Sequence, residues 1–360
     1  MYTQRINALR EKLGQLTLDQ LLVTHPDNIF YLSGFTGSSA AILLSPGLPG
    51  RFITDFRYHE RASANIAGLP LELTDSQLRP LQDVVSSLLP DGSRSRVGIE
   101  AGYMSFLGFS QLAATANIEP VPTVKLIETM RMRKDASEIA LIREAVAMGE
   151  AVFSHAISVI GRETAERDIA LEIEFQARRL GAEGMSFPPI VASGDHASRP
   201  HAGYTDRTLV AGAPLTIDMG VRLHNYCSDM TRTVFIGDCP QHWRAVYNTV
   251  REAKELAAAS LRPGLRGCDV DKVARDFITE AGHGDKFGHG LGHGVGIAIH
   301  EDPRLLWTYE GVLESGNVVS NEPGIYLPGQ GGVRIEDMML LTDSGCENFN
   351  SLPTELQVIG

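Results

Sequence analysis

The segments Thr216-Ile-Asp-Met-Gly220 and Asp229-Met-Thr-Arg-Thr-Val-Phe235 decide the architecture of the second half of this 360-residue chain. Both read as strands, yet each contains an aspartate in an otherwise apolar pattern. Ionised side chains are seldom buried without a partner. If the strands pair as a hairpin whose turn is centred between residues 223 and 224, Asp218 lies directly opposite Asp229, with the Cβ atoms about 5 Å apart. The two segments therefore predict a pair of acids on one face of a sheet.

A second pair of acids follows the same arrangement downstream. Glu322 ends one strand-like run and Glu336 lies in the next, on either side of Pro323-Gly-Ile-Tyr-Leu-Pro-Gly-Gln-Gly-Gly332. A symmetric connection centred on Gly329 places them across from each other. Either pair alone could be a polar hairpin with solvated ends. Four carboxylates at one point, however, repel one another unless cations lie between them, and two divalent ions balance four negative charges. We therefore expect a centre for two metal ions that activates water for hydrolysis.

A histidine cluster accompanies these acids, in Phe287-Gly-His-Gly-Leu-Gly-His-Gly-Val-Gly296 and at His300. His289 and His293 are four residues apart, but the alternating glycines disfavour a helix. We expect extended or turning backbone that directs both imidazoles to one side and lets the main chain approach metal or substrate closely. A glycine-rich phosphate loop is the competing interpretation, and it fails because no register satisfies GxGxxG and no GK[ST] follows. Five metal-compatible side chains result: Asp218, Asp229, His293, Glu322 and Glu336.

Composition and charge exclude several classes of function. The net charge is -12 and no run of Lys or Arg forms a stripe, which argues against nucleic-acid or anionic-membrane partners. The longest apolar runs, such as Ala40 to Leu44, are far too short to span a bilayer, and the first residues lack a signal-peptide core, so we expect a cytoplasmic protein. The cysteines form no CxxC pair and suggest no disulfide framework. They are Cys227, Cys239, Cys268 and Cys346.

The chain divides into two halves. In the first half, short apolar runs alternate with helical stretches and predict strands. We read Pro120 and Pro122 as an interruption of this pattern and place the domain boundary just beyond them, giving domains 1–126 and 127–360. The strands expected in the first domain are Leu21–Val23, Ala40–Ser45, Gly50–Thr54 and Arg96–Ile99.

The second half alternates long helices with strands. Asp135 and Glu138 resemble a helix-capping pair ahead of a long amphipathic pattern, and a second helix opens at Thr164 and ends near Gly181. The fold class we expect is α+β, with helices covering a curved, largely antiparallel sheet. Two further helices are expected at His242–Leu261 and Asp269–Ala281, and strands at Leu215–Val221, Met230–Ile236, Asn317–Ser320 and Val333–Leu341.

Six segments resemble, in the correct order, the signature of the pita-bread metallopeptidases. They are Ser193-Gly-Asp-His-Ala-Ser-Arg-Pro-His201, Ile217-Asp-Met-Gly220, Asp229-Met-Thr-Arg-Thr233, Gly288-His-Gly-Leu-Gly-His293, Asn321-Glu-Pro-Gly-Ile-Tyr326 and Gly332-Val-Arg-Ile-Glu-Asp337. Within that family the chain most resembles the proline-specific branch, which comprises Xaa-Pro dipeptidases (prolidases) and aminopeptidase P. Asn28-Ile-Phe-Tyr-Leu-Ser-Gly34 and Thr54-Asp-Phe-Arg-Tyr58 are similar to the creatinase-like α/β N-terminal domain of this branch.

The resemblance implies a role for each metal-compatible residue. Asp218 and Asp229 would be ligands, and Asp229 would bridge two ions. His293 would hold one ion and Glu322 the other, while Glu336 would form the second bridge.

The resemblance also implies a set of active-site residues around the metals. His201 matches the substrate-side histidine of the family, and His289 and His300 match its other two active-site histidines. Tyr326 and Arg334 occupy positions that contribute to substrate binding and proton traffic in proline-specific members.

An oxygen-rich ligand set with one imidazole favours Mn²⁺ or Co²⁺, with Zn²⁺ as a further choice. We expect a hydroxide that bridges the two ions to attack the carbonyl carbon preceding proline. Glu322 would relay the proton to the departing nitrogen, and His201 or His300 would stabilise the oxyanion. Arg334 would pair with the free proline carboxylate of a dipeptide.

The function favoured by the sequence is an Xaa-Pro dipeptidase that acts on a small peptide with proline in the second position. Aminopeptidase P, which takes longer peptides, is the alternative. A metal-dependent phosphoesterase is disfavoured because the motifs lack a basic phosphate-binding cluster, and a catalytically silent binding protein on the same fold stays open. We also expect a homodimer in which one subunit helps to close the other's site.

Overall fold

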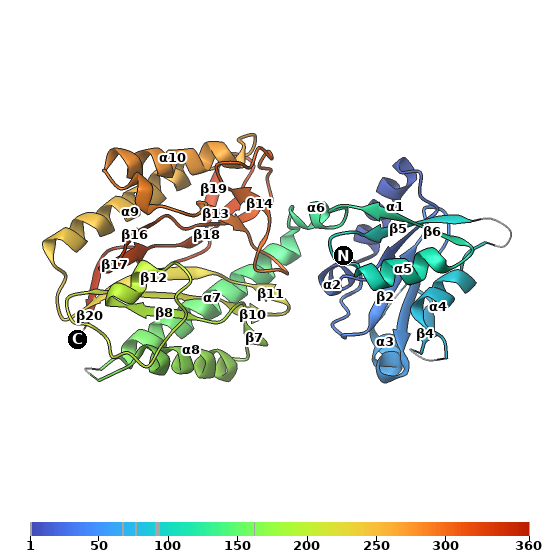
Figure 1. Ribbon diagram of the computed structural model, residues 1–360, viewed down its shortest axis with the longest axis horizontal. Helices are drawn as coiled ribbons and strands as arrows, with labels where there is room; N and C mark the ends of the chain where they lie inside the picture. Colours follow the sequence, from blue (N-terminus) through green and yellow to red (C-terminus); the bar gives the residue numbers. More distant parts are fainter. Residues whose placement is uncertain (1, 67, 76–77, 91–93, 162, 360) are drawn as a thin grey trace. The chain divides into compact units, whose positions relative to one another are not determined.

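The computed structural model describes residues 2–66, 68–75, 78–90, 94–161 and 163–359. It forms two compact units, the first ending at Arg131 and the second beginning at Met132 (Figure 1). The boundary expected from the sequence, after residue 126, lies a few residues earlier. Helix α6 (Glu128–Arg131) belongs with the first unit because Arg131 Nη1 donates a 2.9 Å hydrogen bond to Asn28 Oδ1. Within the described residues, no helix is both long and apolar enough to cross a bilayer.

A six-stranded mixed sheet forms the centre of the first unit, in the order β4-β3-β2-β1-β5-β6. The fully buried strand β1 pairs antiparallel with β2 and parallel with β5. The α/β character expected for this half is confirmed. The strands are β1 (Gln20–Val23), β2 (Ala40–Leu44), β3 (Arg51–Asp55), β4 (Leu71–Thr74), β5 (Ser95–Glu100) and β6 (Ile118–Thr123). The helices are α1 (Tyr2–Gln15), α2 (Pro26–Ser33), η1 (Phe56–Tyr58), α3 (His59–Asn65), α4 (Leu81–Ser87) and α5 (Phe106–Ala114).

The stretch around Pro120 and Pro122 forms a strand, so its interpretation as an interruption was wrong. It is β6, at the edge of the sheet, and it runs parallel to β5. The carbonyls of Asn117 and Thr123 accept hydrogen bonds from the amides of Ser95 and Ala101, which lie at the two ends of β5. Because alternate residues of a strand face opposite neighbours, the even-numbered prolines face away from β5, where no donor is needed. Two prolines spaced by two are therefore compatible with an edge strand.

The second unit contains short strands and long helices. Its strands are β7 (Gly184–Met185), β8 (Ile190–Ser193), β9 (Pro214–Met219), β10 (Val221–Leu223), β11 (Tyr226–Cys227), β12 (Met230–Ile236), β13 (Gly292–Gly294), β14 (Glu301–Leu305), β15 (Val318–Asn321), β16 (Gly324–Leu327), β17 (Gly331–Arg334), β18 (Asp337–Leu341), β19 (Cys346–Asn348) and β20 (Gln357–Ile359). Its helices are α7 (Ala136–Ser158), α8 (Glu166–Leu180), η2 (Gly194–Ser198), α9 (Gln241–Ser260), α10 (Gly267–Glu280) and η3 (Gly284–Lys286).

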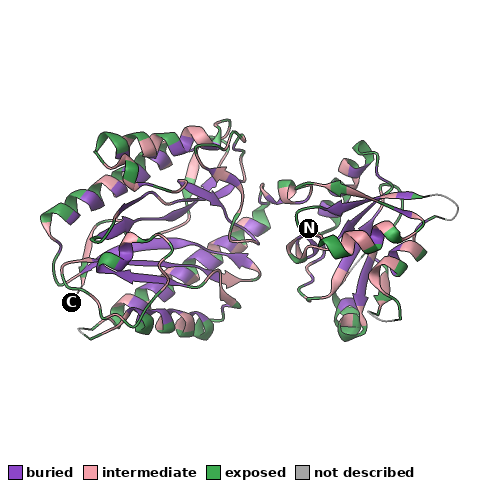
Figure 2. Ribbon diagram, in the orientation of Figure 1, coloured by how far each residue is buried: buried purple, intermediate pink, exposed green. Residues whose placement is uncertain are grey.

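Two pairs of helices enclose these strands (Figure 1). Helices α7 and α8 pack together on one side, where α8 contacts β8, and α9 and α10 pack together on the other, where α9 contacts β15, β16 and β17. The strands between the pairs are mostly buried, and the outer helix faces are exposed (Figure 2). Most ladders are antiparallel, as in β8-β9-β12 and β13-β15-β18. The expectation of helices over a largely antiparallel sheet is confirmed.

The helix ends follow the sequence signals. Asp135 accepts hydrogen bonds from the amides of Ser137 and Glu138, and Glu138 accepts one from the Asp135 amide, so the predicted capping pair is a complete capping box at the start of α7. Helix α8 ends at Leu180 and is followed by Gly181, whose left-handed φ of 101° suits glycine. Helix α7 packs against α8, β10 and β11, and α8 packs against β7 and β8.

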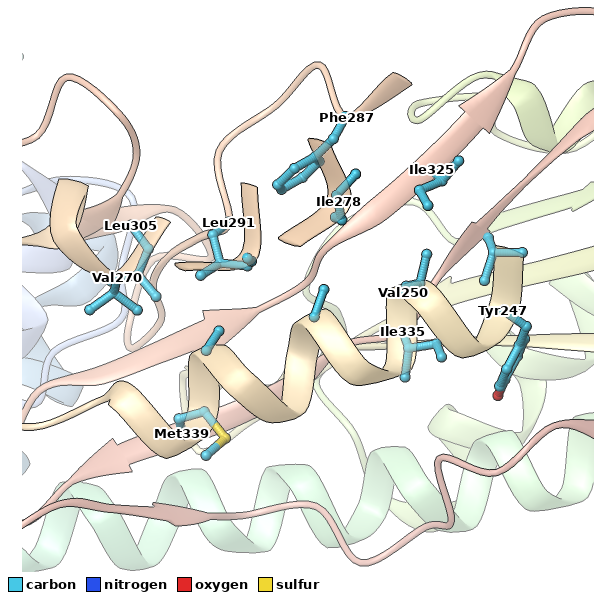
Figure 3. Close-up of a cluster of buried hydrophobic side chains, with 14 of the residues drawn as sticks. Tyr247, Val250, Val270, Ile278, Phe287, Leu291, Leu305, Ile325, Ile335 and Met339 are labelled. Carbon is cyan, nitrogen blue, oxygen red and sulfur yellow. The ribbon is translucent and has the colours of Figure 1, made fainter. Parts of the chain in front are cut away.

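Helix α9 and the strands below it form a large apolar core (Figure 3). Val250 points from α9 toward Ile325, and Tyr247, Met339 and Ile278 of α10 belong to the same cluster. All are buried, and each fully buried side chain of this kind contributes about 1.5–3 kcal/mol. This cluster is the rigid support for β15 to β18.

The hairpin that carries the two aspartates differs in register from the prediction. Asp218 of β9 lies opposite Thr231 of β12, so the expectation that it faces Asp229 directly was wrong. The turn is centred between His224 and Asn225, whose φ values of 51° and 62° are typical of a type I′ turn. Because this moves the pairing by two residues and side chains alternate with a period of two, both aspartates still share one face.

The second hairpin has the predicted register. Gly324 pairs with Arg334 in the β16–β17 ladder, and Asn321 pairs with Asp337 in the β15–β18 ladder. Both ladders are centred on Gly329, so the positions of the two glutamates between them are opposite each other. The single strand expected over Val333–Leu341 is instead divided into β17 and β18, with one of the glutamates in the break.

Candidate metal centre

One cavity of about 510 Å³ in the second unit collects nearly all the predicted site residues. Those that line it are Asp218, Asp229, His293, Glu322, Glu336, His201, His289, His300 and Arg334. Tyr326 lies behind this wall, where its hydroxyl contacts His289 and Arg334. The strand hairpins and the glycine-rich segment therefore meet at one place.

The acids leave ligand atoms unused. Asp229, His293 and Glu336 are buried and offer ligand atoms that all lie within 4.8 Å of one another. Among the described residues, no hydrogen-bond donor reaches Oδ1 of Asp218 or Oε1 of Glu336, although both atoms are buried. Buried carboxylate oxygens without donors are costly unless cations satisfy them. The donor set thus fits divalent metal ions.

Burial and mutual repulsion raise the pKa values of these acids. Burial, followed by the charges of Glu336 and Asp218, raises the pKa of Asp229 well above its ordinary value. Burial and the charge of Glu322 do the same to the pKa of Glu336. Burial raises the pKa of Glu322 to about 7, against the opposing charge of Arg334. The raised pKa values of Asp229, Glu322 and Glu336 favour their protonated forms when no cation is bound, and metal binding would displace those protons.

His293 is oriented as a ligand. Its Nδ1 lies 3.1 Å from the Gly294 carbonyl, which can only accept, so Nδ1 carries the proton. Its Nε2 lies 3.6 Å from Asp229 Oδ2 and 3.4 Å from Glu322 Oε1. Burial lowers the pKa of His293 to about 3, so the ring is neutral and these contacts are not ion pairs. The Nε2 lone pair faces the acids.

Arg334 lines the cavity and is hydrogen-bonded to two other residues of the site. Its Nη2 donates to Asp218 Oδ2 at 2.7 Å, and its Nη1 donates to the Tyr326 hydroxyl at 2.8 Å. Nδ1 of His289 donates to the Gly290 carbonyl, so its Nε2 accepts a 2.8 Å hydrogen bond from the Tyr326 hydroxyl. A hydrogen-bond chain thus runs from the His289 imidazole to Asp218, and the Arg334 side chain within it is 4% exposed.

His201 and His300 lie at the exposed rim of the cavity. The His300 ring packs edge-on against that of His293, with centroids 4.3 Å apart. Partial burial, followed by the charges of Arg304 and His201, lowers the pKa of His300. Two imidazoles at the entrance are placed to contact a bound ligand.

Two polar residues at the site escaped the sequence analysis. Thr231 donates to Glu336 Oε2 at 2.7 Å and accepts from Arg334 Nε at 3.1 Å. Arg304 lines the cavity with its side chain 36% exposed, and its Nε is 3.8 Å from Asp302, beyond hydrogen-bond distance. Thr231 can be recognised as a site residue once its pairing with Asp218 is known. Arg304 can be recognised because it lies on β14 opposite His293.

The glycines around the histidines serve backbone packing. A Cβ on Gly292 would lie 2.0 Å from the Ser320 carbonyl oxygen, and one on Gly294 would lie 2.5 Å from the Asp302 carbonyl oxygen. The expected close approach therefore occurs, but to the neighbouring strands β15 and β14. It places His293 close to Glu322, which directly follows β15.

A buried cluster of acids with one neutral imidazole, enclosed between two helix pairs, defines a metal-dependent peptidase. The chain belongs to metallopeptidase family M24, whose model matches residues 140–343. Residues 5–133 match the Creatinase/Prolidase N-terminal domain. The expected pita-bread and creatinase-like domains are both confirmed.

Individual relatives cover the whole chain. An uncharacterized peptidase from Bacillus subtilis is 36% identical over 99% of this chain and 100% of its own length. The structure of an Xaa-Pro dipeptidase from Bacillus anthracis is 35% identical, covers 100% of both chains and superposes with a TM-score of 0.95. The structure of an X-Pro aminopeptidase from Thermotoga maritima is 33% identical, covers 97% of this chain and 99% of its own, and has a TM-score of 0.89. The phosphoesterase alternative has no support in this family.

Proposed function

We propose that this protein hydrolyses the bond between a first residue and a following proline in small peptides, and that it prefers dipeptides. The observation that carries the proposal is the pair of unpartnered carboxylate oxygens on Asp218 and Glu336 beside the neutral His293. The cavity has the volume typical of small-ligand sites. Relatives named for Xaa-Pro and X-Pro substrates support the specificity for proline.

The metal centre proposed here takes two divalent ions, with Mn²⁺ favoured over Co²⁺ and Zn²⁺ on ligand type. Divalent ions in this position supply Lewis-acid charge and activate water. The residues that would hold them are Asp218, Asp229, His293, Glu322 and Glu336.

The remaining side chains would bind substrate and move protons. Glu322, held by a 3.1 Å hydrogen bond from Ser320 Oγ, is placed to pass a proton to the departing proline nitrogen. His201 and His300 at the rim are placed to donate to the carbonyl oxygen as it becomes negative. His289 lies at the far end of the chain to Tyr326 and holds that hydroxyl in place.

Arg304 is the better partner for the free carboxylate of a dipeptide. Arg334 already serves Asp218, Tyr326 and Thr231, whereas Arg304 is partly exposed at the cavity. A guanidinium matches a carboxylate with two parallel hydrogen bonds. This pairing would exist for a dipeptide and would be lost for a peptide extended beyond proline.

Hydrolysis of Ala-Pro and Ala-Pro-Ala by the metal-loaded protein tests the preference. We expect a higher kcat/KM for Ala-Pro, and Arg304→Met should lower that value about 10- to 100-fold while changing the tripeptide value little. Equal or faster turnover of Ala-Pro-Ala by the unchanged protein would favour an aminopeptidase P instead.

A catalytically silent binding protein would bind far fewer than two ions per chain and show no metal-stimulated cleavage. Elemental analysis after metal loading, together with the same assay, separates this alternative. The homodimer stays a prediction, and light scattering of the active protein tests it.

A further inference from the structure

Helix α10 carries an ion pair whose burial the proposed chemistry does not explain. Nε and Nη2 of Arg275 lie 2.7 and 2.8 Å from the two oxygens of Asp271. Asp271 is fully buried, and the Arg275 side chain is 23% exposed. Ion pairs four residues apart on a helix surface contribute a few tenths of a kcal/mol. Burial of this acid therefore points to a role beyond helix stability.

Both partners also hold the backbone of the glycine-rich segment 287–291. Arg275 Nη1 donates to the Phe287 carbonyl and Nη2 to the His289 carbonyl, each at 2.8 Å. Asp271 Oδ1 accepts from the Leu291 amide at 3.0 Å. Every second residue of the segment is thus tied to α10.

Aromatic rings fix the guanidinium in this position. Its central carbon lies 4.3 Å from the centroid of the Phe287 ring and 4.7 Å from that of Trp307. Such contacts orient a planar cation as well as attract it. Arg275 does not itself line the cavity.

The segment held in this way leads directly to the reacting groups. His289 accepts a hydrogen bond from the Tyr326 hydroxyl, and the Leu291 carbonyl accepts a 2.8 Å hydrogen bond from the Glu322 amide. Gly288 and Gly290 flank the histidine, and glycine has the largest backbone freedom to lose. Contacts from outside the segment, such as those from α10, are therefore needed to hold its backbone in one conformation.

We propose that Asp271 and Arg275 are positioning residues for His289, and that they hold its imidazole against Tyr326 from outside the cavity. The inference rests on the proposed function for its kinetic consequence. Substitution of a group that orients an active-site side chain commonly lowers turnover, because the active-site side chain is slightly displaced even though the orienting group never touches substrate. A displaced His289 imidazole would affect Asp218 through the hydrogen bonds that link His289 to Tyr326, Tyr326 to Arg334 and Arg334 to Asp218.

Arg275→Met removes the forked hydrogen bonds but retains an unbranched side chain between the two rings. We expect kcat for Ala-Pro to fall about 10-fold or more, with KM and metal content unchanged. Arg275→Lys keeps the charge beside Asp271 but lacks the fork, and it should show a similar loss. The matched control is Lys272→Met on the same helix, which breaks the exposed ion pair to Asp276 and should change nothing.

Hydrogen exchange of the peptide spanning residues 287–293, followed by mass spectrometry, supplies a readout that does not depend on activity. Exchange should accelerate in Arg275→Met and stay unchanged in Lys272→Met. Unchanged exchange and kcat in Arg275→Met would overturn the inference, as would a loss of turnover that simply tracks loss of metal or of folded protein. If the unchanged protein fails to cleave Ala-Pro, the proposed function falls, and the exchange measurement alone decides the positioning role.

Discussion

Arg334 and Asp218 form a buried ion pair, with Nη2 and Oδ2 2.7 Å apart and side chains 4% and 12% exposed. The pair neutralises one acid of the metal centre before any cation binds. It also links that acid to Tyr326. The electrostatic balance of the site is therefore set partly by the protein itself.

Arg334→Met should destabilise the metal-free protein by about 3–5 kcal/mol, because it leaves Asp218 buried without its cation. Urea unfolding in the presence of a chelator measures this, and saturating Mn²⁺ should recover part of the loss. Arg133→Met, at an exposed ion pair with Glu314, is the control and should stay within about 0.5 kcal/mol of the unchanged protein. Equal stability of both variants would contradict the view that Arg334 neutralises the site.

Glu336→Ala and His201→Ala should separate metal binding from turnover. The first removes a buried oxygen ligand and should lose one or both ions, whereas the second removes an exposed rim imidazole and should keep them while kcat falls about 100-fold or more. Elemental analysis and steady-state kinetics measure the two effects. His224→Ala, in the exposed β10–β11 turn, should leave both unchanged. Equal metal loss in the first two variants would mean that the two roles are misassigned.

Metal should stabilise the protein more at pH 8 than at pH 5. The pKa of Glu322 is raised to about 7 from an ordinary value of 4.5. Protonation of Glu322 therefore stabilises the folded, metal-free protein. That stability is present below about pH 4.5 and is lost as the pH rises through about 7, by on the order of 3 kcal/mol for this group. Thermal unfolding with and without Mn²⁺ across this range gives the comparison. A metal-induced shift that shrinks with rising pH would count against protonated acids in the metal-free site.

Gly292→Ala should damage both stability and metal binding. The added Cβ would lie 2.0 Å from the Ser320 carbonyl oxygen, so β13 must move away from β15 and carry His293 with it. We expect a loss of about 1–3 kcal/mol in unfolding free energy and weaker Mn²⁺ binding by calorimetry. Gly288→Ala is the matched control in the same segment, because its Cβ would meet no atom within 4 Å. Similar behaviour of the two variants would refute a packing role for Gly292.

The acid pairs and their common face could be predicted because a strand's side-chain period of two survives an error in register. The exact partner of Asp218 could not, since the chain between the strands allows a turn at either of two positions. The left-handed His224 and Asn225 select the actual one, and asparagine is a residue that tolerates that conformation. The hairpin centred on Gly329 was predictable because its length and its glycines leave one symmetric arrangement.

The polar partners of the acids were harder to foresee. Thr231 and Arg334 act through contacts across strands far apart in sequence, and residue type alone does not disclose them. The contacts that Arg334 makes with Asp218 and Tyr326 could not be read from its residue type. Asp271 and Arg275 resemble an ordinary helix-surface pair until the segment above them is in place.

The alternating prolines of β6 determine how the six-stranded sheet can associate. Pro120 and Pro122 remove two amide donors from the outward row of that strand. An incoming strand would find no donor at those positions and could not form a regular ladder. That border of the sheet is thereby closed to extension by another extended chain, and the N-terminal domain is protected there against self-templated aggregation.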